Sequence, residues 1–213
     1  MKNRINLFFD AVFFCVLDSN YIKERHINMK KNFSVIPSVR DIKALNRALA
    51  IPGDTILLST ITHIGNLREL VLLCHKAGKR VIVNHELVGG LGNDNMAFEM
   101  LKKMYKVDAV IESNQIYAGR AKAAGIEVIL KIPLIDSLAR ESALRMINNV
   151  KPDTLEVKPA ICALDNITKI QKGYAGKIFA SGFIDDTAFA DKLYNSGLDG
   201  IMTSRQELWD RFY

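Results

Sequence analysis

Residues 177–186 read KIFASGFIDD, and this stretch decides the fold. A short apolar run ends at Ser181-Gly182 and passes at once into an Asp-rich segment that is typical of a helix start. A nearly continuous apolar run of about five residues indicates a strand buried on both faces, as in a parallel sheet. Residues 197–208, GLDGIMTSRQEL, repeat the pattern and again end an apolar run on small hydroxyl residues.

Working outward from this stretch, we find the same unit along most of the chain. Apolar runs alternate with segments of helical periodicity, such as the one in which Leu67, Leu70, Val71 and Cys74 share a face. The eighth helix is expected in residues 205–212, RQELWDRF. The expected strands lie within residues 34–39, 54–60, 80–87, 109–113, 127–134, 154–160, 177–183 and 200–204.

Eight strand–helix units favour an α/β fold that closes into a small parallel (βα)8 barrel of the TIM type, the phosphate-binding variety. An open doubly wound sheet normally has five or six strands and is the alternative. We expect one barrel domain over residues 32–213, preceded by an N-terminal extension over residues 1–31. The extension's apolar part, INLFFDAVFFCVL, is too short to span a bilayer. It is either a sequence upstream of a start at Met29 or a genuine N-terminal helix.

Composition is that of an ordinary globular protein, with 213 residues, 49% hydrophobic and 24% charged. The formal net charge of +6 is compatible with nucleic-acid binding but does not require it. Cys15, Cys74 and Cys162 are odd in number and form no CxxC pair, which favours reduced thiols in a reducing compartment.

Several motifs resemble one family. IPSVRDIKAL, ELVGGLGNDNMAFEMLKK, LEVKPA, ASGFI and MTSRQELW are similar to the glycerol-3-phosphate-responsive (glycerol uptake operon) antiterminator regulatory proteins, over roughly Val35 to Trp209. The block GLGND and the terminal TS…ELW are the most specific parts. One departure is that the family pattern has a histidine followed two residues later by an aspartate in the third strand. Asn84, His85 and Glu86 stand there in this chain, which affects the polar contacts expected on that side of the pocket.

The resemblance implies a cytoplasmic transcription antiterminator that senses glycerol 3-phosphate and binds the leader mRNA of glycerol-utilisation genes. It implies no catalysis, no metal and no cofactor, with glycerol 3-phosphate as an effector ligand. A homo-oligomer is possible, and no membrane partner is expected. One alternative is a phosphosugar isomerase, aldolase or lyase that uses Lys158 and Glu156. Another is a barrel that binds a phosphorylated metabolite and regulates a protein partner.

A phosphate site is expected after strands seven and eight, where many barrels of this type bind phosphate. Ser181, Gly182 and Phe183 end the seventh strand, while Thr203 and Ser204 end the eighth. Glycine lets backbone N–H groups approach an anion, hydroxyls add hydrogen bonds, and a following helix N-terminus adds partial positive charge. The plain alternative is that Gly182 only makes a tight turn. Asp185 and Asp186 are expected to cap the next helix.

Charged side chains complete the predicted ligand site. Glu156 and Lys158 alternate with apolar neighbours and are therefore expected to face the barrel mouth, as ligand contacts or as an internal salt bridge. Arg40 ends the first strand, which closure brings beside the eighth, and offers a bidentate guanidinium. Lys131 ends the fifth strand, where charge pairing is favoured over a Schiff base.

Two further groups have weaker signals. His63, His85, Glu86 and Glu112 lie near the ends of strands two to four, but lack metal-ligand spacing and are expected to bond at the pocket rim. Residues 89–94 form a glycine-rich loop into a helix, either a lid or a simple turn. Basic residues near helix C-termini suit the helix dipole and also predict an RNA face opposite the ligand. They are Lys76, Lys79, Arg80, Lys102, Lys103, Lys106, Lys169 and Lys172; residues 23–31 are a rival basic tract.

Overall fold

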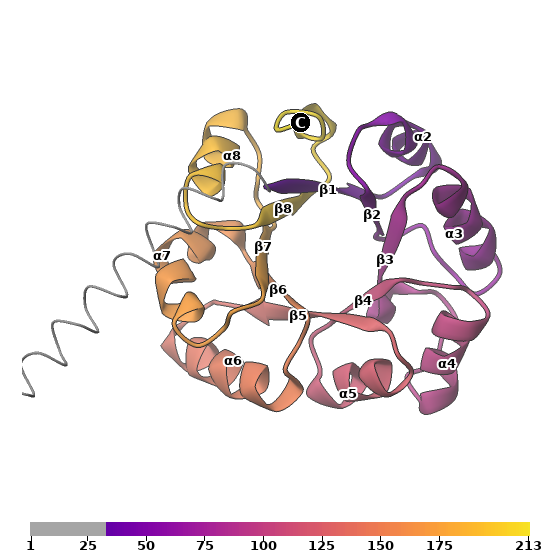
Figure 1. Cartoon of the computed structure of the whole chain (residues 1–213), viewed down its shortest axis with the longest axis horizontal. Coiled ribbons are helices and arrows are strands. Elements are labelled where there is room, and N and C mark those ends of the chain that lie inside the picture. The colour runs from indigo at the N-terminus through magenta and orange to yellow at the C-terminus, as the bar shows by residue number, and fades with distance from the viewer. Residues whose placement is uncertain (1–32) are drawn as a thin grey trace, which may run out of the picture. The chain divides into compact units, whose positions relative to one another are not determined.

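A computed structural model describes residues 33–213, in which eight parallel strands form a ring with helices around the outside (Figure 1). The expected extension over residues 1–31 lies outside the described residues. The strands are β1 Ser34–Val39, β2 Thr55–Leu58, β3 Arg80–Asn84, β4 Ala109–Glu112, β5 Glu127–Pro133, β6 Thr154–Lys158, β7 Lys177–Ser181 and β8 Gly200–Thr203. Each pairs with the next one along the chain.

Closure of the ring depends on the pairing of the first strand with the last. Residues Ser34 to Pro37 of β1 lie in parallel register with Gly200 to Thr203 of β8. Gly200 is required at this seam, because a Cβ there would lie 2.2 Å from the Ser34 carbonyl oxygen. The predicted closed (βα)8 barrel is therefore confirmed, and the open doubly wound sheet is wrong.

Seven α-helices follow strands β1 to β7 in the described part of the chain. None of them combines the length and hydropathy that a membrane span needs. They are α2 Ile42–Ala50, α3 Leu67–Lys76, α4 Asn95–Lys103, α5 Gln115–Ala123, α6 Ser137–Val150, α7 Ala160–Gln171 and α8 Thr187–Tyr194.

Helix ends follow the chemistry that the sequence predicts. Asp186 accepts a hydrogen bond from the Phe189 backbone N–H at 2.7 Å, and Asp41, Asp94 and Asp136 cap α2, α4 and α6 in the same way. At the other ends, Gly78, Gly125 and Gly197 have positive φ angles of +73°, +74° and +99°. A glycine in this left-handed conformation ends α3, α5 and α8 before the next strand begins.

The ring interior is filled by one apolar layer of side chains from the strands. Each fully buried Ile or Leu contributes roughly 2 kcal/mol relative to an exposed one. This layer lies inside the ring, below the carboxyl ends of the strands. Its residues are Ile36, Leu57, Ile82, Ala109, Ile111, Ile129, Phe179 and Met202.

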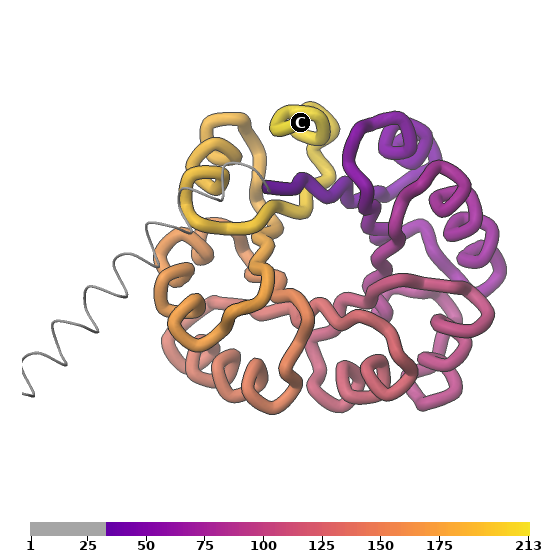
Figure 2. Tube along the Cα trace, viewed as in Figure 1, coloured from indigo at the N-terminus to yellow at the C-terminus, as the bar shows by residue number. Residues whose placement is uncertain are grey.

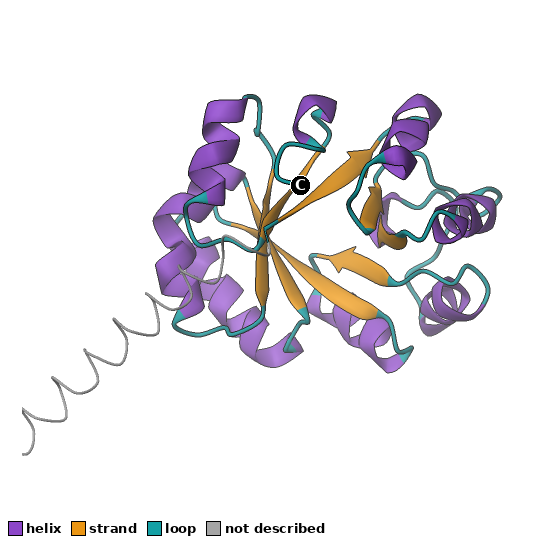
Figure 3. Cartoon of the chain, turned by 45° about the horizontal axis from the view of Figure 1, so that its top comes forward, coloured by secondary structure: helices purple, strands orange, loops and turns teal. Residues whose placement is uncertain are grey.

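Two expected elements are wrong. The third strand stops at Asn84, and His85–Leu87 form a 3₁₀ turn, η2, rather than more strand. Residues 205–212 are not a helix, since only the 3₁₀ turn η3, Gln206–Leu208, follows β8. The C-terminal segment lies between α8 and α2, beside β1 (Figure 2), and leaves the ring without a long helix there (Figure 3).

Trp209 explains why the last segment departs from the helical pattern. Its side chain is fully buried, and the indole N–H donates to the carbonyl oxygen of Thr203 at 2.9 Å. Tyr213 then donates to the Val35 carbonyl oxygen at 3.0 Å. Both bonds attach the segment to the barrel. A helix continued through residues 205–212 would leave the Trp209 indole N–H and the Thr203 carbonyl unpaired.

We predict that Trp209→Phe lowers the free energy of unfolding by about 2 kcal/mol, since it leaves the Thr203 carbonyl without its donor and reduces buried area. Tyr213→Phe is the matched control and should cost less than about 1 kcal/mol, because this side chain is half exposed. Chemical denaturation of both variants checks this. Equal losses would contradict the anchoring role of Trp209.

Candidate functional site

A cavity of about 680 Å³ opens at the carboxyl ends of the strands. It is large enough for a small phosphorylated metabolite, and its wall is formed by strand ends and βα turns. Its lining comprises Ser38, Arg40, Leu57, Ser59, Asn84, Leu87, Ile111, Lys131, Glu156, Lys158, Ser181, Gly182, Phe183, Ile184, Asp185, Met202, Thr203, Ser204 and Arg205.

All nine residues predicted for the ligand site line this one cavity. They come from five strands that are far apart in sequence and are brought together by closure of the ring. Their role in binding a ligand stays a prediction. They are Arg40, Lys131, Glu156, Lys158, Ser181, Gly182, Phe183, Thr203 and Ser204.

The turn after β7 has the backbone shape that the glycine suggested. Gly182 has a φ of +80°, and Phe183 follows with a φ of +56°, so two successive residues are left-handed. A Cβ at Gly182 would lie 3.2 Å from Cε of Lys158. Glycine therefore does two things here, because it allows the turn and lets the Lys158 side chain pass close to the backbone.

The turn after β8 is adjacent, since Ser181 pairs in register with Met202. The Thr203 hydroxyl accepts a hydrogen bond from the Arg205 backbone N–H at 3.1 Å and keeps its own proton to donate. The predicted helix dipole after β8 is wrong, because three 3₁₀ residues supply little aligned dipole. Positive charge at this end of the cavity comes instead from side chains.

Glu156 faces the cavity, as alternation along β6 predicts, and is buried. Its carboxylate accepts a hydrogen bond from the Ser181 hydroxyl at 2.5 Å and is not in an ion pair with Lys158. One carboxylate oxygen thus fixes the end of β7.

The charge balance of the cavity favours an anion. Four cationic side chains line it, Arg40, Lys131, Lys158 and Arg205, against the two carboxylates Glu156 and Asp185. Asp185 and Arg205 approach to 3.6 Å at the exposed rim, where an ion pair is worth little. Low-dielectric walls strengthen the attraction of the remaining cations for a phosphate group.

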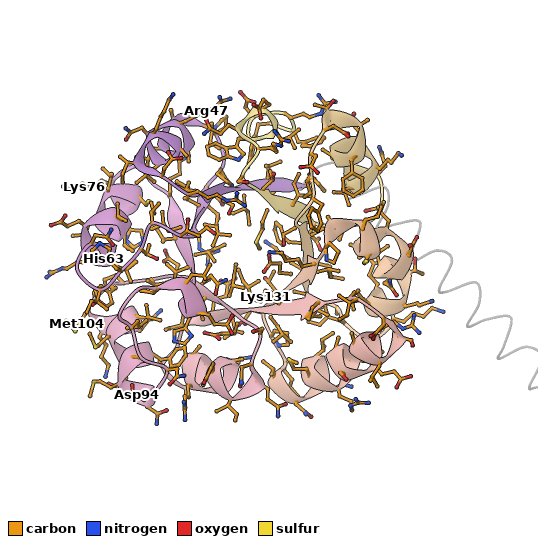
Figure 4. The ribbon with its side chains drawn as sticks, turned by 180° about the vertical axis from the view of Figure 1, so that it is seen from behind. Arg47, His63, Lys76, Asp94, Met104 and Lys131 are labelled. Atoms are coloured by element: carbon orange, nitrogen blue, oxygen red, sulfur yellow. The ribbon has the colours of Figure 1, made fainter. Side chains whose placement is uncertain are left out.

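Lys131 lies inside the ring of strands (Figure 4). Its ammonium is 3.1 Å from the carboxylate of Glu86, which comes from η2. The prediction of ordinary charge pairing at this lysine is therefore supported by its geometry. His63, also labelled in Figure 4, lies at the periphery instead.

The four residues weighed as metal ligands form separate contacts. His85 approaches Glu112, Glu86 binds Lys131, and the ring of His63 accepts from the Gly65 backbone N–H. Between residues 33 and 213, no three His, Cys, Asp or Glu side chains are grouped as a metal site would require.

The cavity contains polar residues that the sequence did not predict, among them Ser38 and Ser59 on the wall formed by β1 to β3. Asn84, where the chain departs from the family pattern, lines the same wall, and its Oδ1 atom is buried without a hydrogen-bond partner. Strand alternation could have found Ser38, which lies two residues before Arg40 and so faces the same side. The prediction that Asp185 caps the next helix is wrong, because Asp185 lines the cavity and Asp186 is the cap.

The basic residues for which an RNA-binding face is predicted lie near helix C-termini, at the other end of the barrel, and their role in binding RNA stays a prediction. Lys79 does not belong to this face, because its side chain is buried and its ammonium donates to the carbonyls of Ile51 and Gly53. Arg80 is held by Glu127 at 2.6 Å, and Lys103 by Glu99 at 2.8 Å. The remaining predicted residues, Lys76, Lys102, Lys106, Lys169 and Lys172, end helices or follow them, and all but the half-buried Lys102 are exposed.

We predict that Gly182→Ala weakens binding of inorganic phosphate at least about tenfold, because the added methyl displaces Lys158 and strains the turn. Gly78→Ala is the matched control, with a φ of +73° and no atom within 4 Å of the new Cβ. Both variants should lose about 1 kcal/mol of stability. Calorimetry should show weaker binding only for Gly182→Ala; equal binding by the two would contradict the site.

Comparison with known proteins connects this cavity to a family. A solved glycerol uptake operon antiterminator regulatory protein from Listeria monocytogenes is 27% identical, with a TM-score of 0.78 over 84% of this chain and 96% of that one. A glycerol uptake operon antiterminator-related protein from Thermotoga maritima is 25% identical, with a TM-score of 0.74 over 83% and 98%. An uncharacterized Escherichia coli (strain K12) protein, YgcP, is 22% identical over 86% of this chain and 95% of its own length.

The family model described as glycerol-3-phosphate responsive antiterminator matches residues 35–209, which include all of the cavity wall and all but the first residue of β1. The chain belongs to the glycerol-3-phosphate responsive antiterminator family.

Proposed function

We propose that this protein binds glycerol 3-phosphate in the barrel cavity and, in response, binds leader mRNA of glycerol-utilisation genes in the cytoplasm to prevent premature termination. Family membership supports the response to glycerol 3-phosphate. The observation that carries the proposal is the convergence of the β7 and β8 turns with Arg40 and Lys158 on one cavity.

The ligand has two chemical parts, and the cavity has groups for each. We assign the phosphate to the wall made by Gly182, Ser204 and Arg40, where backbone, hydroxyl and guanidinium donors meet. We assign the glycerol hydroxyls to Glu156 and Asn84, which offer acceptor oxygens on the other strands. No cofactor is part of this proposal.

RNA is assigned to the exposed lysines at the helix C-termini, on the face away from the cavity. The cavity rim is the less suitable face, because the aspartates that cap α2, α4, α6 and α8 surround it with negative charge. Lysines at helix ends contact phosphates without reading bases, so sequence recognition needs further contacts.

We predict that glycerol 3-phosphate raises the melting temperature by roughly 5–10 °C at a hundredfold excess over its dissociation constant. A ligand that binds only the folded state adds about 2.7 kcal/mol under those conditions. Glycerol, which lacks the phosphate, is the matched control and should give less than about 1 °C at the same concentration. Differential scanning fluorimetry measures both. No shift with millimolar glycerol 3-phosphate would contradict the proposal.

We predict that the double variant Lys106→Glu and Lys172→Glu binds leader RNA at least about tenfold more weakly, because two phosphate contacts become repulsions. The slope of log affinity against log salt should also fall by roughly 1.4. Lys43→Glu, at the exposed start of α2 on the cavity side, is the charge-matched control and should bind RNA normally. Filter binding at several salt concentrations measures the RNA affinity of each variant. A similar loss of affinity in Lys43→Glu would count against RNA binding at this face.

One observation favours a catalytic alternative, namely that Lys131, Lys158 and Glu156 share the cavity. An isomerase, aldolase or lyase would use these groups on a phosphosugar. Turnover of triose and sugar phosphates by the purified protein, abolished in Lys158→Ala, would support this alternative. Leader-RNA binding that responds to glycerol 3-phosphate, without turnover, would exclude it as the main activity.

A further inference from the structure

The 3₁₀ turn η2, His85–Leu87, connects the cavity to a surface loop. Its three side chains point to three different places. Leu87 lines the cavity, Glu86 reaches Lys131, and His85 is buried behind the strand wall. A change at any one of these contacts therefore acts on a single short segment.

Glu86 is held by two hydrogen bonds. One carboxylate oxygen accepts from the Ser113 hydroxyl at 2.7 Å, and the other lies 3.1 Å from the Lys131 ammonium. Partial burial raises the pKa of Glu86, but the bonds from Ser113 and Lys131 outweigh it and the net pKa is lowered. Glu86 is thus an anion that already neutralises one of the cavity's four cations.

His85 connects the same turn to residues 89–94, which we term the glycine loop. Its Nε2 atom lies 2.9 Å from the Gly92 carbonyl oxygen, and its ring contacts Phe98 and Tyr117 with centroids 4.6 and 5.8 Å away. Its Nδ1 atom lies 2.9 Å from the fully buried Glu112 carboxylate, off the direction of an ideal hydrogen bond.

The glycine loop is held at both ends. Gly89 pairs with the turn after β2, where its N–H donates to the Thr62 carbonyl at 3.0 Å and its carbonyl accepts from the Ile64 N–H at 2.9 Å. At the far end, Asn93 donates to the Tyr117 hydroxyl at 2.6 Å. Between these ends, the bond from His85 to Gly92 attaches the loop to η2.

We propose that an anion bound in the cavity takes Lys131 away from Glu86, and that loss of this ion pair releases η2 and with it the glycine loop. The proposal rests on the proposed function, since it assumes that the cavity binds a phosphorylated ligand. It identifies the moving segment through which occupancy of the cavity changes the protein surface.

Electrostatics gives the direction of this exchange. A phosphate dianion in the cavity and the Glu86 carboxylate compete for the same Lys131 ammonium. The phosphate carries the larger charge, and the Glu86 side chain is 37% exposed, so water weakens its attraction for the ammonium. Lys131 is only 21% exposed, so little water competes with the two anions for its ammonium. The two anions also repel each other across the cation, which makes the intact Glu86 pair and the bound ligand mutually unfavourable.

Thermodynamic reciprocity gives the proposal a testable sign. If the ligand weakens the Glu86–Lys131 pair, then removing the pair must strengthen ligand binding by the same factor. Glu86→Gln keeps the side-chain shape and can still accept a hydrogen bond from Ser113, but it loses the charge. An ordinary positioning role, in which Glu86 holds Lys131 in place for the ligand, predicts the opposite sign.

The experiment is hydrogen exchange by mass spectrometry on the full chain, with glycerol 3-phosphate and with inorganic phosphate as probes. Ligand should speed exchange about tenfold at amides whose bonds hold the turn and the loop in place. In Glu86→Gln, exchange there should be fast with or without ligand, and calorimetry should show about five- to tenfold tighter binding. The reporting amides are those of Ile64, Val88, Gly89 and Leu91.

Glu99→Gln is the matched control, because Glu99 forms an exposed ion pair with Lys103 on α4 and does not contact the cavity. It should behave like the unmodified chain in both measurements. Weaker binding by Glu86→Gln, or ligand binding without any change in loop exchange, would overturn this proposal alone. Failure of the unmodified chain to bind either probe would overturn the proposed function as well. In that case neither glycerol 3-phosphate nor inorganic phosphate would shift its melting temperature.

Discussion

The pairing of β1 with β8 is the constraint on which the rest of the structure depends. Parallel pairing around a closed ring sends every strand's carboxyl end to one edge. It also leaves alternate side chains only two destinations, the ring interior or the helix layer. The cavity follows from these two facts, since the turns after β7 and β8 and the end of β1 become neighbours.

The cavity has an apolar floor and a charged wall. Leu57, Ile111 and Met202 of the buried apolar layer line it from below and give it a low-dielectric floor. Lys131, Glu156 and Lys158 stand directly on this floor at the ends of β5 and β6. The apolar floor screens these cations less than water would, which strengthens their attraction for a small anion at this position.

The family relationship and the geometry of the cavity point to the same kind of ligand. The family model covers the barrel and describes a response to glycerol 3-phosphate, while the cavity offers donors and cations suited to such a ligand. A sensor also needs a segment with two arrangements. In our proposal this segment is the 3₁₀ turn η2, because one short turn bonds both to a cavity lysine and to a surface loop.

Eight apolar runs with capped helices between them were enough to predict the barrel and to place Ser181, Gly182 and Arg40 near a common site, because strand periodicity and turn chemistry are local properties. Tertiary structure alone decided the rest. Residues 205–212 have a helical pattern, yet burial of Trp209 and its bond to Thr203 prevent the helix. The sequence pattern predicts that Lys79 is a surface cation, but in the structure its ammonium is buried and donates to two loop carbonyls. The partners of Lys79 are 28 and 26 residues away, and burial of Trp209 depends on packing against the closed barrel, so no local pattern records either contact.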